Sequence, residues 1–381
     1  MQRLHIAIFT DTFLPQINGV SLATVLLAQG LAKKKHKVII VCPQYTKNDP
    51  SLPGVKLCRV PSLPAFFYEK YKAGLPLQPK LFKALHDVDV IHFQTPFTLG
   101  LSAVAIAHVL KKPLVQTFHT FYADPQYLQH AGLNKPWAER LMWKYASWIN
   151  NQCQLITTPS AFTRRELIRK GCTQQIIVIS NGVVKSTHNR QGAMALQKKY
   201  GKDLLLFVGR IAHEKNIDYL LDCFKMVSRR RPSAKLLLVG DGPQRDDAMR
   251  TIKRLRLSEK VILLGSIPHD ELLASGTFEA CKLFVTASVT ENQPLTILEA
   301  QEKGLVCIGV RAKGIPDCIN NGKTGYVLKR NDKKGFAKAI VRLLEDDRQY
   351  AHMKSATLTQ IREHRIDAII GRWEKAYAAL L

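Results

Sequence analysis

Short, continuous apolar runs alternate with longer amphipathic segments along almost the whole chain. The runs are rich in Ile, Val and Leu and mostly lack strict apolar–polar alternation, which is typical of parallel strands buried on both faces. A strand followed by a helix, repeated many times, predicts a doubly wound α/β sheet. In the first half we expect strands over 4–10, 37–42, 88–93, 113–118, 154–158 and 175–179, and helices over 19–34, 98–110, 136–151 and 160–170.

The pattern repeats in the second half, with strands expected over 203–208, 235–239, 261–264, 283–286 and 305–308. A chain of 381 residues is long enough for two domains of ordinary size. The polar stretch 184–201 is expected to be the linker. We predict an N-terminal domain over 1–186, a C-terminal domain over 187–360, and a C-terminal helix over 361–381 that packs back toward the N-terminal domain. Two such domains place a ligand cleft between the carboxyl ends of two facing sheets.

The chain carries an unusually large positive charge, a formal net of +26 with a pI near 9.8. The excess is spread over both halves and indicates attraction to an anionic partner, which can be nucleic acid, a phosphorylated ligand or an anionic membrane surface. Solubility alone is the plainer explanation of such a charge. The hydrophobic fraction of 46% excludes a disordered chain.

The eight cysteines are scattered, with no Cys-x-x-Cys pair. We therefore expect small buried side chains, and neither a disulfide framework nor a metal site. Met1 leads directly into the apolar stretch 4–9 without a basic leader or a cleavage site, and the longest apolar window, 97–110, is too short to span a bilayer. We expect a cytoplasmic protein.

A glycine loop follows the first expected strand. Asn18 and Gly19 stand at the mouth of the helix that comes next, where backbone N–H groups and the helix N-terminus favour an anion. The loop is not a G-x-G-x-x-G fingerprint, so a dehydrogenase is not supported. A lone glycine in a loop usually marks only a turn. Its interpretation as part of an anion site depends on the motifs of the second half.

Basic and glycine-rich motifs end two strands of the second half. Gly209 and Arg210 follow one strand, and Lys215 opens the helix after it, so that a diphosphate could be bound there. Gly240-Asp241-Gly242 forms a strand-to-helix junction whose glycines permit close backbone approach to a flat base. Surface cations and plain turns are the alternative interpretations of these motifs.

The strongest motif is a pair of glutamates, Glu291 and Glu299, at the end of another strand and in the helix that follows it. Sugar and ribose hydroxyls need acceptor groups, and carboxylates supply them. Two Glu at this spacing are frequent on solvated helices, but Glu299 lies in an apolar helix start, which makes solvation a weaker explanation. The residues of this motif assigned to donor binding, besides Glu299, are Asn292, Gln293 and Leu295.

Taken in order, these motifs resemble the family-four retaining glycosyltransferases of the GT-B fold. The segments 314–317 and 321–325 also look like the closing turns of that family, and the resemblance covers nearly the whole chain. It implies two Rossmann-like domains, an acceptor-side one first and a nucleotide-sugar-binding one second. It also implies that Arg210 and Lys215 bind the donor's diphosphate, Glu291 the donor sugar and Glu299 the ribose.

The stretch 116–124 resembles the active-site stretch of bacterial glucosyltransferases that act on diacylglycerol, and 10–20 is similar to their opening. The resemblance implies that His119 contacts the donor sugar near the reacting carbon. It places Asp11, Tyr122 and Asp124 on the acceptor side. Two positions depart from the pattern, since Ala123 stands where that subgroup usually has Glu, and Pro294 stands where a glycine is usual.

This resemblance implies transfer of a hexose, from UDP-glucose to a membrane lipid such as 1,2-diacylglycerol, with no cofactor beyond the donor. We expect no metal, because Arg210, Lys215 and the helix at Gly19 supply positive field. The one Asp-x-Asp, at 87–89, leads into the amino end of a strand and is expected to be structural. Phe66, Phe67, Lys70 and Lys72 are expected to contact an anionic membrane on the cytoplasmic face. A loop packed against its own domain is the alternative interpretation of this segment.

Other functions stay open at this point. Mannosyl or other hexosyl transfer to a phosphoinositide-type lipid or a polysaccharide would use the same fold, and so would a GT-B sugar-nucleotide epimerase. A nucleic-acid-binding protein would explain the charge. It would not explain the two glutamates or the paired nucleotide-type domains.

Overall fold

The computed structural model describes residues 2–46, 48–64, 72–76, 78–125, 128, 135–185 and 187–381, which divide into two compact units. The N-terminal unit comprises Met1–Gly182 and Ile366–Leu381, and the C-terminal unit comprises Val183–Arg365. The chain thus passes from one unit to the other twice, and its last helix belongs to the N-terminal unit. These boundaries differ by only a few residues from those expected at 186/187 and 360/361.

A seven-stranded parallel sheet forms the centre of the N-terminal unit, in the order β3-β2-β1-β6-β7-β8-β9. Successive side chains of β1 point to opposite faces, so Ile6 and Ile8 join one core cluster while Ala7 and Phe9 join another. Both faces are therefore covered, which explains the continuous apolar runs. The strands are β1 (His5–Phe9), β2 (Lys37–Pro43), β3 (Lys56–Val60), β6 (Val90–Phe93), β7 (Leu114–Thr117), β8 (Leu155–Thr158) and β9 (Ile176–Val178).

Three strands of this unit are not predicted by the sequence pattern. The edge strand β3 carries Lys56 and Arg59 and is mostly half-buried, so it has no continuous apolar run. A separate antiparallel pair joins β4 (Ser62–Pro64) to β5 (Lys72–Gly74). Strands of three residues are too short for periodicity to reveal them.

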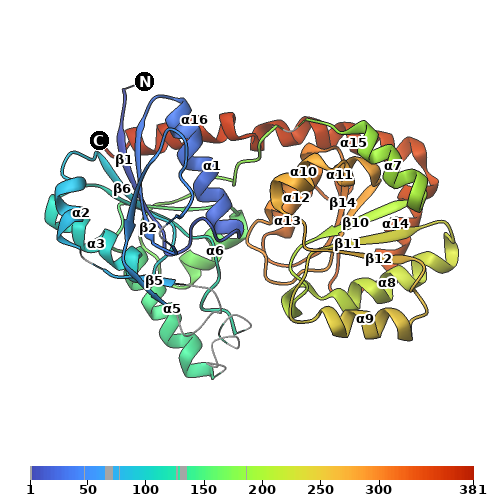
Figure 1. Ribbon diagram of the computed structural model, residues 1–381. Helices are drawn as coiled ribbons and strands as arrows, with labels where there is room; N and C mark the ends of the chain where they lie inside the picture. The colour runs from blue at the N-terminus through green and yellow to red at the C-terminus, as the bar shows by residue number, and fades with distance from the viewer. Residues whose placement is uncertain are drawn as a thin grey trace. The chain divides into compact units, whose positions relative to one another are not determined.

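Helices cover both faces of this sheet, and Figure 1 shows the red C-terminal helix α16 running beside the blue α1. Gly30 of α1 permits this approach, because a Cβ there would lie 2.5 Å from the Ile370 side chain of α16. Ile369, Trp373 and Tyr377 of α16 belong to the core cluster that contains Ile6 and Ile8 of β1. The helices are α1 (Gly19–Lys33), α2 (Pro79–Ala84), α3 (Thr98–Leu110), α5 (Pro136–Asn150), α6 (Ala161–Arg169) and α16 (Ile366–Ala378).

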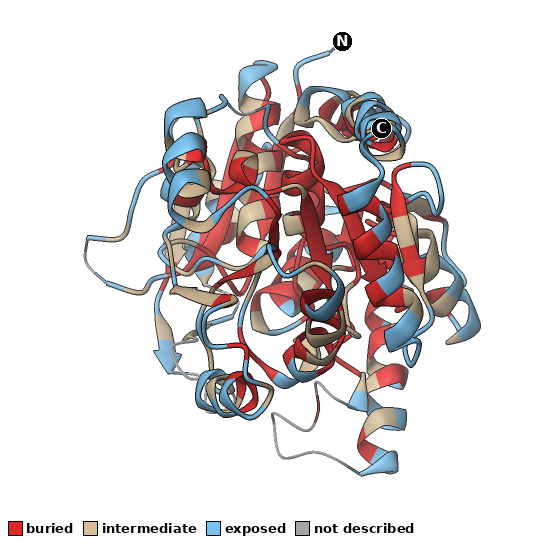
Figure 2. Cartoon of the chain, turned by 90° about the vertical axis from the view of Figure 1, so that its right-hand side faces the viewer, coloured by how far each residue is buried: buried red, intermediate tan, exposed pale blue. Residues whose placement is uncertain are grey.

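The C-terminal unit is built on a six-stranded parallel sheet in the order β12-β11-β10-β13-β14-β15. The strands are β10 (Leu204–Val208), β11 (Lys235–Val239), β12 (Val261–Gly265), β13 (Leu283–Thr286), β14 (Val306–Val310) and β15 (Gly325–Leu328). In Figure 2 the buried residues gather in the strands and on the inner helix faces. This unit, like the other, is a doubly wound α/β sheet.

One helix of the C-terminal unit precedes its first strand, and the others lie between or after the strands. The helices are α7 (Arg190–Tyr200), α8 (Ile217–Arg230), α9 (Arg245–Arg254), α10 (His269–Ala274), α11 (Thr277–Ala280), α12 (Leu295–Glu302), α13 (Ile315–Cys318), α14 (Lys333–Glu345) and α15 (Asp347–Gln360), with 3-10 turns η1 (His213–Lys215) and η2 (Ile361–His364). No helix in the described part of the chain is long and apolar enough to cross a membrane.

The prediction of a linker over 184–201 is wrong for most of that stretch, because α7 is an integral part of the C-terminal unit. Asn189 caps the helix by accepting a hydrogen bond from the Gly192 N–H at 2.8 Å. A Cβ at Gly192 would lie 2.1 Å from the Ser275 carbonyl oxygen, so α7 packs tightly against the segment before α11. Only Ala193 of the helix is fully buried, and its polar exposed face makes the sequence look like a linker.

Candidate active site

An ion pair joins two strand ends of the C-terminal unit. Lys215 lies in η1, shortly after β10, and Glu291 lies in the loop after the neighbouring strand β13. The Lys215 Nζ donates to Glu291 Oε1, and the Ser288 hydroxyl donates to the same oxygen at 2.9 Å. About a fifth of each charged side chain remains exposed, 21% for Lys215 and 19% for Glu291. The pair is therefore held by the fold and still open to a ligand.

The environment keeps Glu291 ionised. Burial by itself raises the pKa of Glu291, but the Lys215 ammonium, the hydrogen bonds from Lys215 and Ser288, and the Lys313 charge together lower it below its ordinary value. An ionised carboxylate accepts hydrogen bonds only, so the ligand groups that suit it are hydroxyl donors. A sugar supplies several of them on one ring.

Gly209 and Arg210 directly follow β10. Arg210 is exposed. Gly209 has a φ of +156°, a value that residues other than glycine rarely adopt. The structure therefore places two cations, Arg210 and Lys215, in the same segment at the carboxyl end of the sheet, the edge where open α/β sheets bind ligands.

Gly240 and Gly242 let the loop after β11 lie against the loop after β10. A Cβ at Gly240 would lie 1.9 Å from the Gly209 carbonyl oxygen, and one at Gly242 would lie 2.4 Å from that of Ile211. The two loops are joined by a hydrogen bond from the Ile211 N–H to the Asp241 carbonyl oxygen at 2.9 Å. The glycines allow one loop to lie on the other, while Asp241 is exposed.

Glu299 is buried in α12 and paired with a residue that the sequence did not reveal. Its Oε1 lies 2.7 Å from the Nε2 of His269, the first residue of α10. The hydrogen bond to Glu299 raises the pKa of His269, against the lowering effect of burial. Asn292 and Gln293 are also buried, and Leu295 begins α12 directly after Pro294. No spacing in the sequence connects His269 with Glu299.

In the N-terminal unit, His119 follows the end of β7 and is partly accessible. Its Nε2 lies 2.6 Å from the side-chain oxygen of Gln94. Because that oxygen is an acceptor, Nε2 is assigned the hydrogen. Burial lowers the pKa of His119 to about 4, so the ring is neutral near pH 7. The hydrogen bond to Gln94 therefore fixes both the tautomer and the orientation of the neutral His119 ring.

A chain of buried polar side chains continues from Gln94 into the core, and sequence reasoning missed it. The Gln94 Nε2 contacts the ring of His92 at 3.0 Å, and His92 Nδ1 lies 2.8 Å from the hydroxyl of Tyr377 in α16. Burial, with a smaller effect of His119, lowers the pKa of His92 to about 3. His92 Nε2 also contacts Thr117 at 2.7 Å. The C-terminal helix thus takes part in holding His119.

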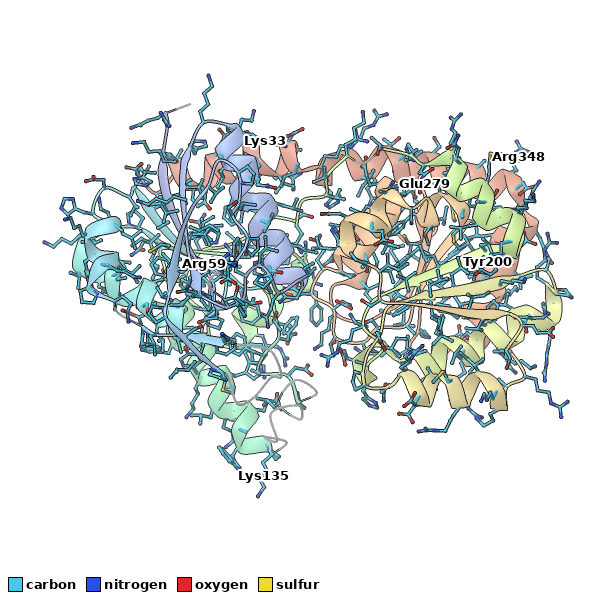
Figure 3. The ribbon with its side chains drawn as sticks, in the orientation of Figure 1. Lys33, Arg59, Lys135, Tyr200, Glu279 and Arg348 are labelled. Atoms are coloured by element: carbon cyan, nitrogen blue, oxygen red, sulfur yellow. The ribbon has the colours of Figure 1, made fainter. Side chains whose placement is uncertain are left out.

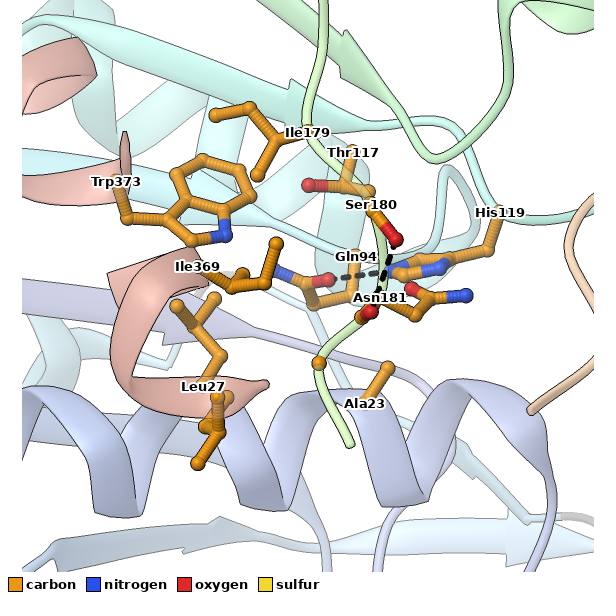
Figure 4. A pocket seen from close by; sticks show the side chains of 12 residues that line it. Ala23, Leu27, Gln94, Thr117, His119, Ile179, Ser180, Asn181, Ile369 and Trp373 are labelled. Carbon is orange, nitrogen blue, oxygen red and sulfur yellow. Dashed lines mark hydrogen bonds between the residues drawn. The ribbon is translucent and has the colours of Figure 1, made fainter. Parts of the chain in front are cut away.

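A small cavity lies next to this chain (Figure 4). Gln94 and His119 form one part of its wall, and Trp373 and Ile369 of α16 form another. Its volume of about 20 Å³ is enough for about one water molecule. Helix α16 therefore closes the inner side of the space beside His119.

Asn18 caps helix α1 instead of leaving its N-terminus bare. Its side-chain oxygen accepts from the N–H groups of Val20 and Ser21, each at 3.0 Å. Gly19 is exposed, and a Cβ there would meet nothing within 4 Å. Two of the N–H groups expected to bind an anion are thus already used, although the space above Gly19 is open.

The three residues expected on the acceptor side have different surroundings. Both carboxylate oxygens of Asp11 accept hydrogen bonds at the start of α3, Oδ2 from Thr95 at 2.6 Å and Oδ1 from Thr98 and the Leu99 N–H at 2.8 Å. Asp11 thus anchors α3 to the strand edge, and burial raises its pKa against these hydrogen bonds.

Tyr122 is buried against the rings of Phe97 and Phe118, at centroid distances of 5.7 and 5.5 Å, and burial raises its pKa. Asp124 is only half-buried. Of the three residues, Asp124 is the most exposed and therefore the most accessible to a bound molecule.

Two further predictions concern residues away from these groups. Phe66, Phe67 and Lys70 lie outside the described residues, whereas Lys72 lies in β5 and its Nζ donates to the Tyr45 carbonyl oxygen. In the Asp-x-Asp motif, Asp89 accepts a hydrogen bond from the His5 N–H at 2.7 Å, at the amino end of β1. That carboxylate serves the fold, as expected.

Known proteins similar to this chain identify its family. The model described as "Glycosyltransferase Family 4" matches residues 17–186, and the one described as "Glycosyl transferases group 1" matches residues 193–360. An α-monoglucosyldiacylglycerol synthase of Streptococcus pneumoniae is 30% identical over 79% of this chain and 70% of its own length. The chain belongs to glycosyltransferase family 4.

Other relatives of this glycosyltransferase carry different sugars in their names. A GDP-mannose-dependent α-mannosyltransferase of Corynebacterium glutamicum is 28% identical over 99% of this chain and 89% of its own length. Sulfoquinovosyl transferase SQD2 of Arabidopsis thaliana is 29% identical over 84% of this chain, which spans 65% of that protein's length. The names of these relatives therefore differ in the sugar that they mention.

The fold agrees with the family. The crystal structure of Anabaena HepE in complex with UDP-glucose superposes with a TM-score of 0.79, at 18% sequence identity, over 98% of this chain and all of that one. The two doubly wound units therefore form the GT-B architecture, and the expected fold class is confirmed.

Proposed function

We propose that this glycosyltransferase moves a hexose, with retention of configuration, from UDP-glucose to a membrane lipid acceptor such as 1,2-diacylglycerol. The observation that carries the proposal is the Lys215–Glu291 pair at the carboxyl end of the sheet, where a cation and an ionised hydroxyl acceptor lie side by side. The similarity to a lipid glucosyltransferase over most of the chain supports the choice of glucose and lipid.

The C-terminal unit is proposed to hold the donor. The Lys215 ammonium and the Arg210 guanidinium neutralise the two phosphates, and the Glu291 carboxylate accepts hydrogen bonds from hydroxyls of the sugar. Glu299, oriented by His269, accepts from the ribose. These protein cations stabilise the leaving diphosphate, so the reaction is proposed to need no metal ion.

The transfer step is proposed to proceed on one face of the sugar. The bond between the anomeric carbon and the diphosphate oxygen breaks, and the bond to the acceptor oxygen forms on the same face. The acceptor's proton passes to a leaving phosphate oxygen, so no protein base is required. The neutral His119, fixed by Gln94, contacts the sugar near the reacting carbon and helps to orient it.

A second candidate is mannosyl transfer from GDP-mannose to a phosphoinositide-type lipid. The similarity to GDP-mannose-dependent mannosyltransferases over nearly the whole chain favours it. Pro294, three residues after Glu291, is also relevant to which sugar nucleotide is bound. A proline has no backbone N–H, so this residue cannot donate a hydrogen bond to the donor.

Radiolabelled UDP-glucose, UDP-galactose and GDP-mannose, each offered with diacylglycerol or phosphatidylinositol, test the proposal. Glucolipid formed from UDP-glucose and diacylglycerol, and lost in Glu291→Gln, is the expected result. Preferential labelling of phosphatidylinositol from GDP-mannose would support the second candidate instead. Interconversion of the free sugar nucleotides without transfer would overturn both, because it would show an epimerase.

A further inference from the structure

Helix α5 of the N-terminal unit carries an apolar and basic stripe on its outer face. Trp137, Leu141 and Trp148 are 58%, 57% and 51% exposed, although large apolar side chains are usually buried. Arg140 and Lys144 are exposed on the same helix. We call these five residues the α5 stripe.

The spacing places these five side chains together. At 100° per residue, positions 137, 141, 144 and 148 fall within about 60° of the helix circumference, and position 140 lies about 40° beyond them. The stripe therefore runs along one side of the helix for three turns. It is continuous, with two tryptophans near its ends and two cations in its middle.

The opposite face of the same helix holds α5 in the fold. Trp143, Ala146 and Ile149 belong to a buried core cluster of the N-terminal unit, and Ala138 is buried as well. The Trp143 ring stacks on Phe118 at a centroid distance of 6.4 Å. Helix α5 is thus anchored to the unit by a face other than the stripe. Figure 3 shows that the start of α5, next to the labelled Lys135, points away from the sheet.

A stripe of this composition matches an anionic lipid surface. Tryptophan is enriched where hydrocarbon meets water, because its ring is apolar and its N–H still reaches polar groups. Arg140 and Lys144, together with Lys135 just before the helix, attract anionic headgroups, and a net charge of +26 adds to that attraction. A helix with tryptophan and basic residues on one face suits a position in the plane of the interface.

A second copy of this chain suits the stripe less well. Two stripes facing each other would bring Arg140 and Lys144 of both copies together in the middle of the contact, without a carboxylate on the stripe to offset them. The large positive charge of each whole copy adds to the repulsion.

We propose that the α5 stripe docks the protein on anionic membrane lipid, with Trp137, Leu141 and Trp148 in the interface and Arg140 and Lys144 at the headgroups. The proposal deepens the proposed function, since it concerns how the enzyme reaches a lipid acceptor. It names a surface other than the one predicted at Phe66 and Phe67.

The tryptophans supply a direct measurement of docking. The chain has four, and the two outside the stripe, Trp143 and Trp373, are buried. Vesicles of phosphatidylcholine with increasing phosphatidylglycerol should shift the emission of the intact protein to the blue, and brominated lipid chains should quench it. Quenching that is absent at every phosphatidylglycerol content would overturn the proposal.

Variants separate the stripe from the rest of the surface. In vesicle co-sedimentation, Trp137→Ser/Trp148→Ser should bind at least about tenfold more weakly than the intact protein, since the apolar contact is lost. Arg140→Gln/Lys144→Gln should weaken binding at low salt and differ less from the intact protein at high salt, because salt screens exposed charges. Trp137→Phe/Trp148→Phe should retain most binding.

The matched control is Val109→Ser/Met194→Ser, which removes two apolar side chains that are 65% and 68% exposed on other helices. It should bind vesicles like the intact protein. Equal losses in the control and in the stripe variant would overturn the proposal. So would unchanged binding in the stripe variant combined with loss in Phe66→Ser/Phe67→Ser, or a stripe variant that merely converts a dimer to a monomer in ultracentrifugation.

Activity assays distinguish this proposal from the proposed function. The stripe variant should transfer sugar to acceptor dispersed in detergent at the rate of the intact protein, and fail mainly on vesicles. Vesicle docking through the stripe without transfer to any lipid would leave the surface standing and overturn the function. Transfer to detergent-dispersed lipid, with no vesicle binding by the intact protein, would support the proposed function and overturn the docking surface.

Discussion

Lys215 and Glu291, 76 residues apart in the chain, meet as an ion pair where β10 and β13 end side by side. Parallel pairing puts the carboxyl ends of neighbouring strands at one edge, so the loops after them supply side chains to the same place. Ser288, from the same loop as Glu291, is a second donor to the same carboxylate oxygen. The proposed donor site starts from this pair.

Glu291→Gln and Lys215→Met should each lower the turnover number by about 10²–10³, if each group acts on charge that develops as the donor's bond breaks. Because both side chains are partly exposed, each substitution should leave the fold intact, as judged by circular dichroism and thermal unfolding. The control is Glu259→Gln, at an exposed position of the same unit. A variant of either residue that transfers sugar at the normal rate would remove it from the proposed site.

Transfer should continue at an unchanged rate after extensive dialysis against EDTA, because the positive field at the diphosphate is proposed to come from Arg210 and Lys215. The rate is measured with and without added Mg²⁺ or Mn²⁺. Loss of activity on chelation, restored by either ion, would show that a metal supplies part of that field.

The His269–Glu299 pair should make stability depend on pH in one direction. The folded pKa of His269 is raised by its hydrogen bond to Glu299, so the contribution of the pair is full below the unfolded pKa of about 6.5 and is lost as the pH rises through the folded pKa. Urea unfolding of the intact protein and of His269→Gln should differ most at pH 6 or below. A difference that grows toward alkaline pH would contradict this assignment.

The hydroxyl of Tyr377 should matter to the site although it lies in the C-terminal helix. Tyr377→Phe removes the hydroxyl that lies 2.8 Å from the buried His92 Nδ1, which leaves this atom only a longer contact of 3.3 Å with Gln94. The loss should cost about 1–3 kcal/mol of unfolding free energy. If the chain of hydrogen bonds orients His119, the turnover number should also fall at saturating donor. Unchanged turnover with lowered stability would limit Tyr377 to a structural role.

Gly240→Ala should be far more harmful than Gly19→Ala. Gly240 has a φ of +136°, and its Cβ would lie 1.9 Å from the Gly209 carbonyl oxygen, so the two loops would have to separate. Gly19 begins a helix with nothing within 4 Å of a Cβ, and alanine there should be neutral or slightly stabilising. Thermal unfolding of the two variants measures the difference directly, and equal midpoints would contradict it.

The order and type of most elements follow from the amino-acid pattern, since buried parallel strands and amphipathic helices have periods that can be read locally. Strands β3, β4, β5 and β15 and helix α7 are not predicted in this way. The sequence also indicated Lys215, Glu291 and Glu299, because polar residues that follow apolar strands gather at one sheet edge.

Which polar groups are partners depends on tertiary packing and not on any local pattern. His269 reaches Glu299 across 30 residues, and Tyr377 reaches His92 across 285. Such pairings leave no local period, because they result from the packing of distant elements. The carboxylate of Asp11 likewise accepts hydrogen bonds at the start of α3, far away in the chain. Helix α7 was not predicted for a different reason, because most of its residues are polar and exposed. Exposure too is a tertiary property. The helical spacing separates Trp143 from Trp137 and Trp148, but only the packing of α5 shows that Trp143 is buried and the other two face outward.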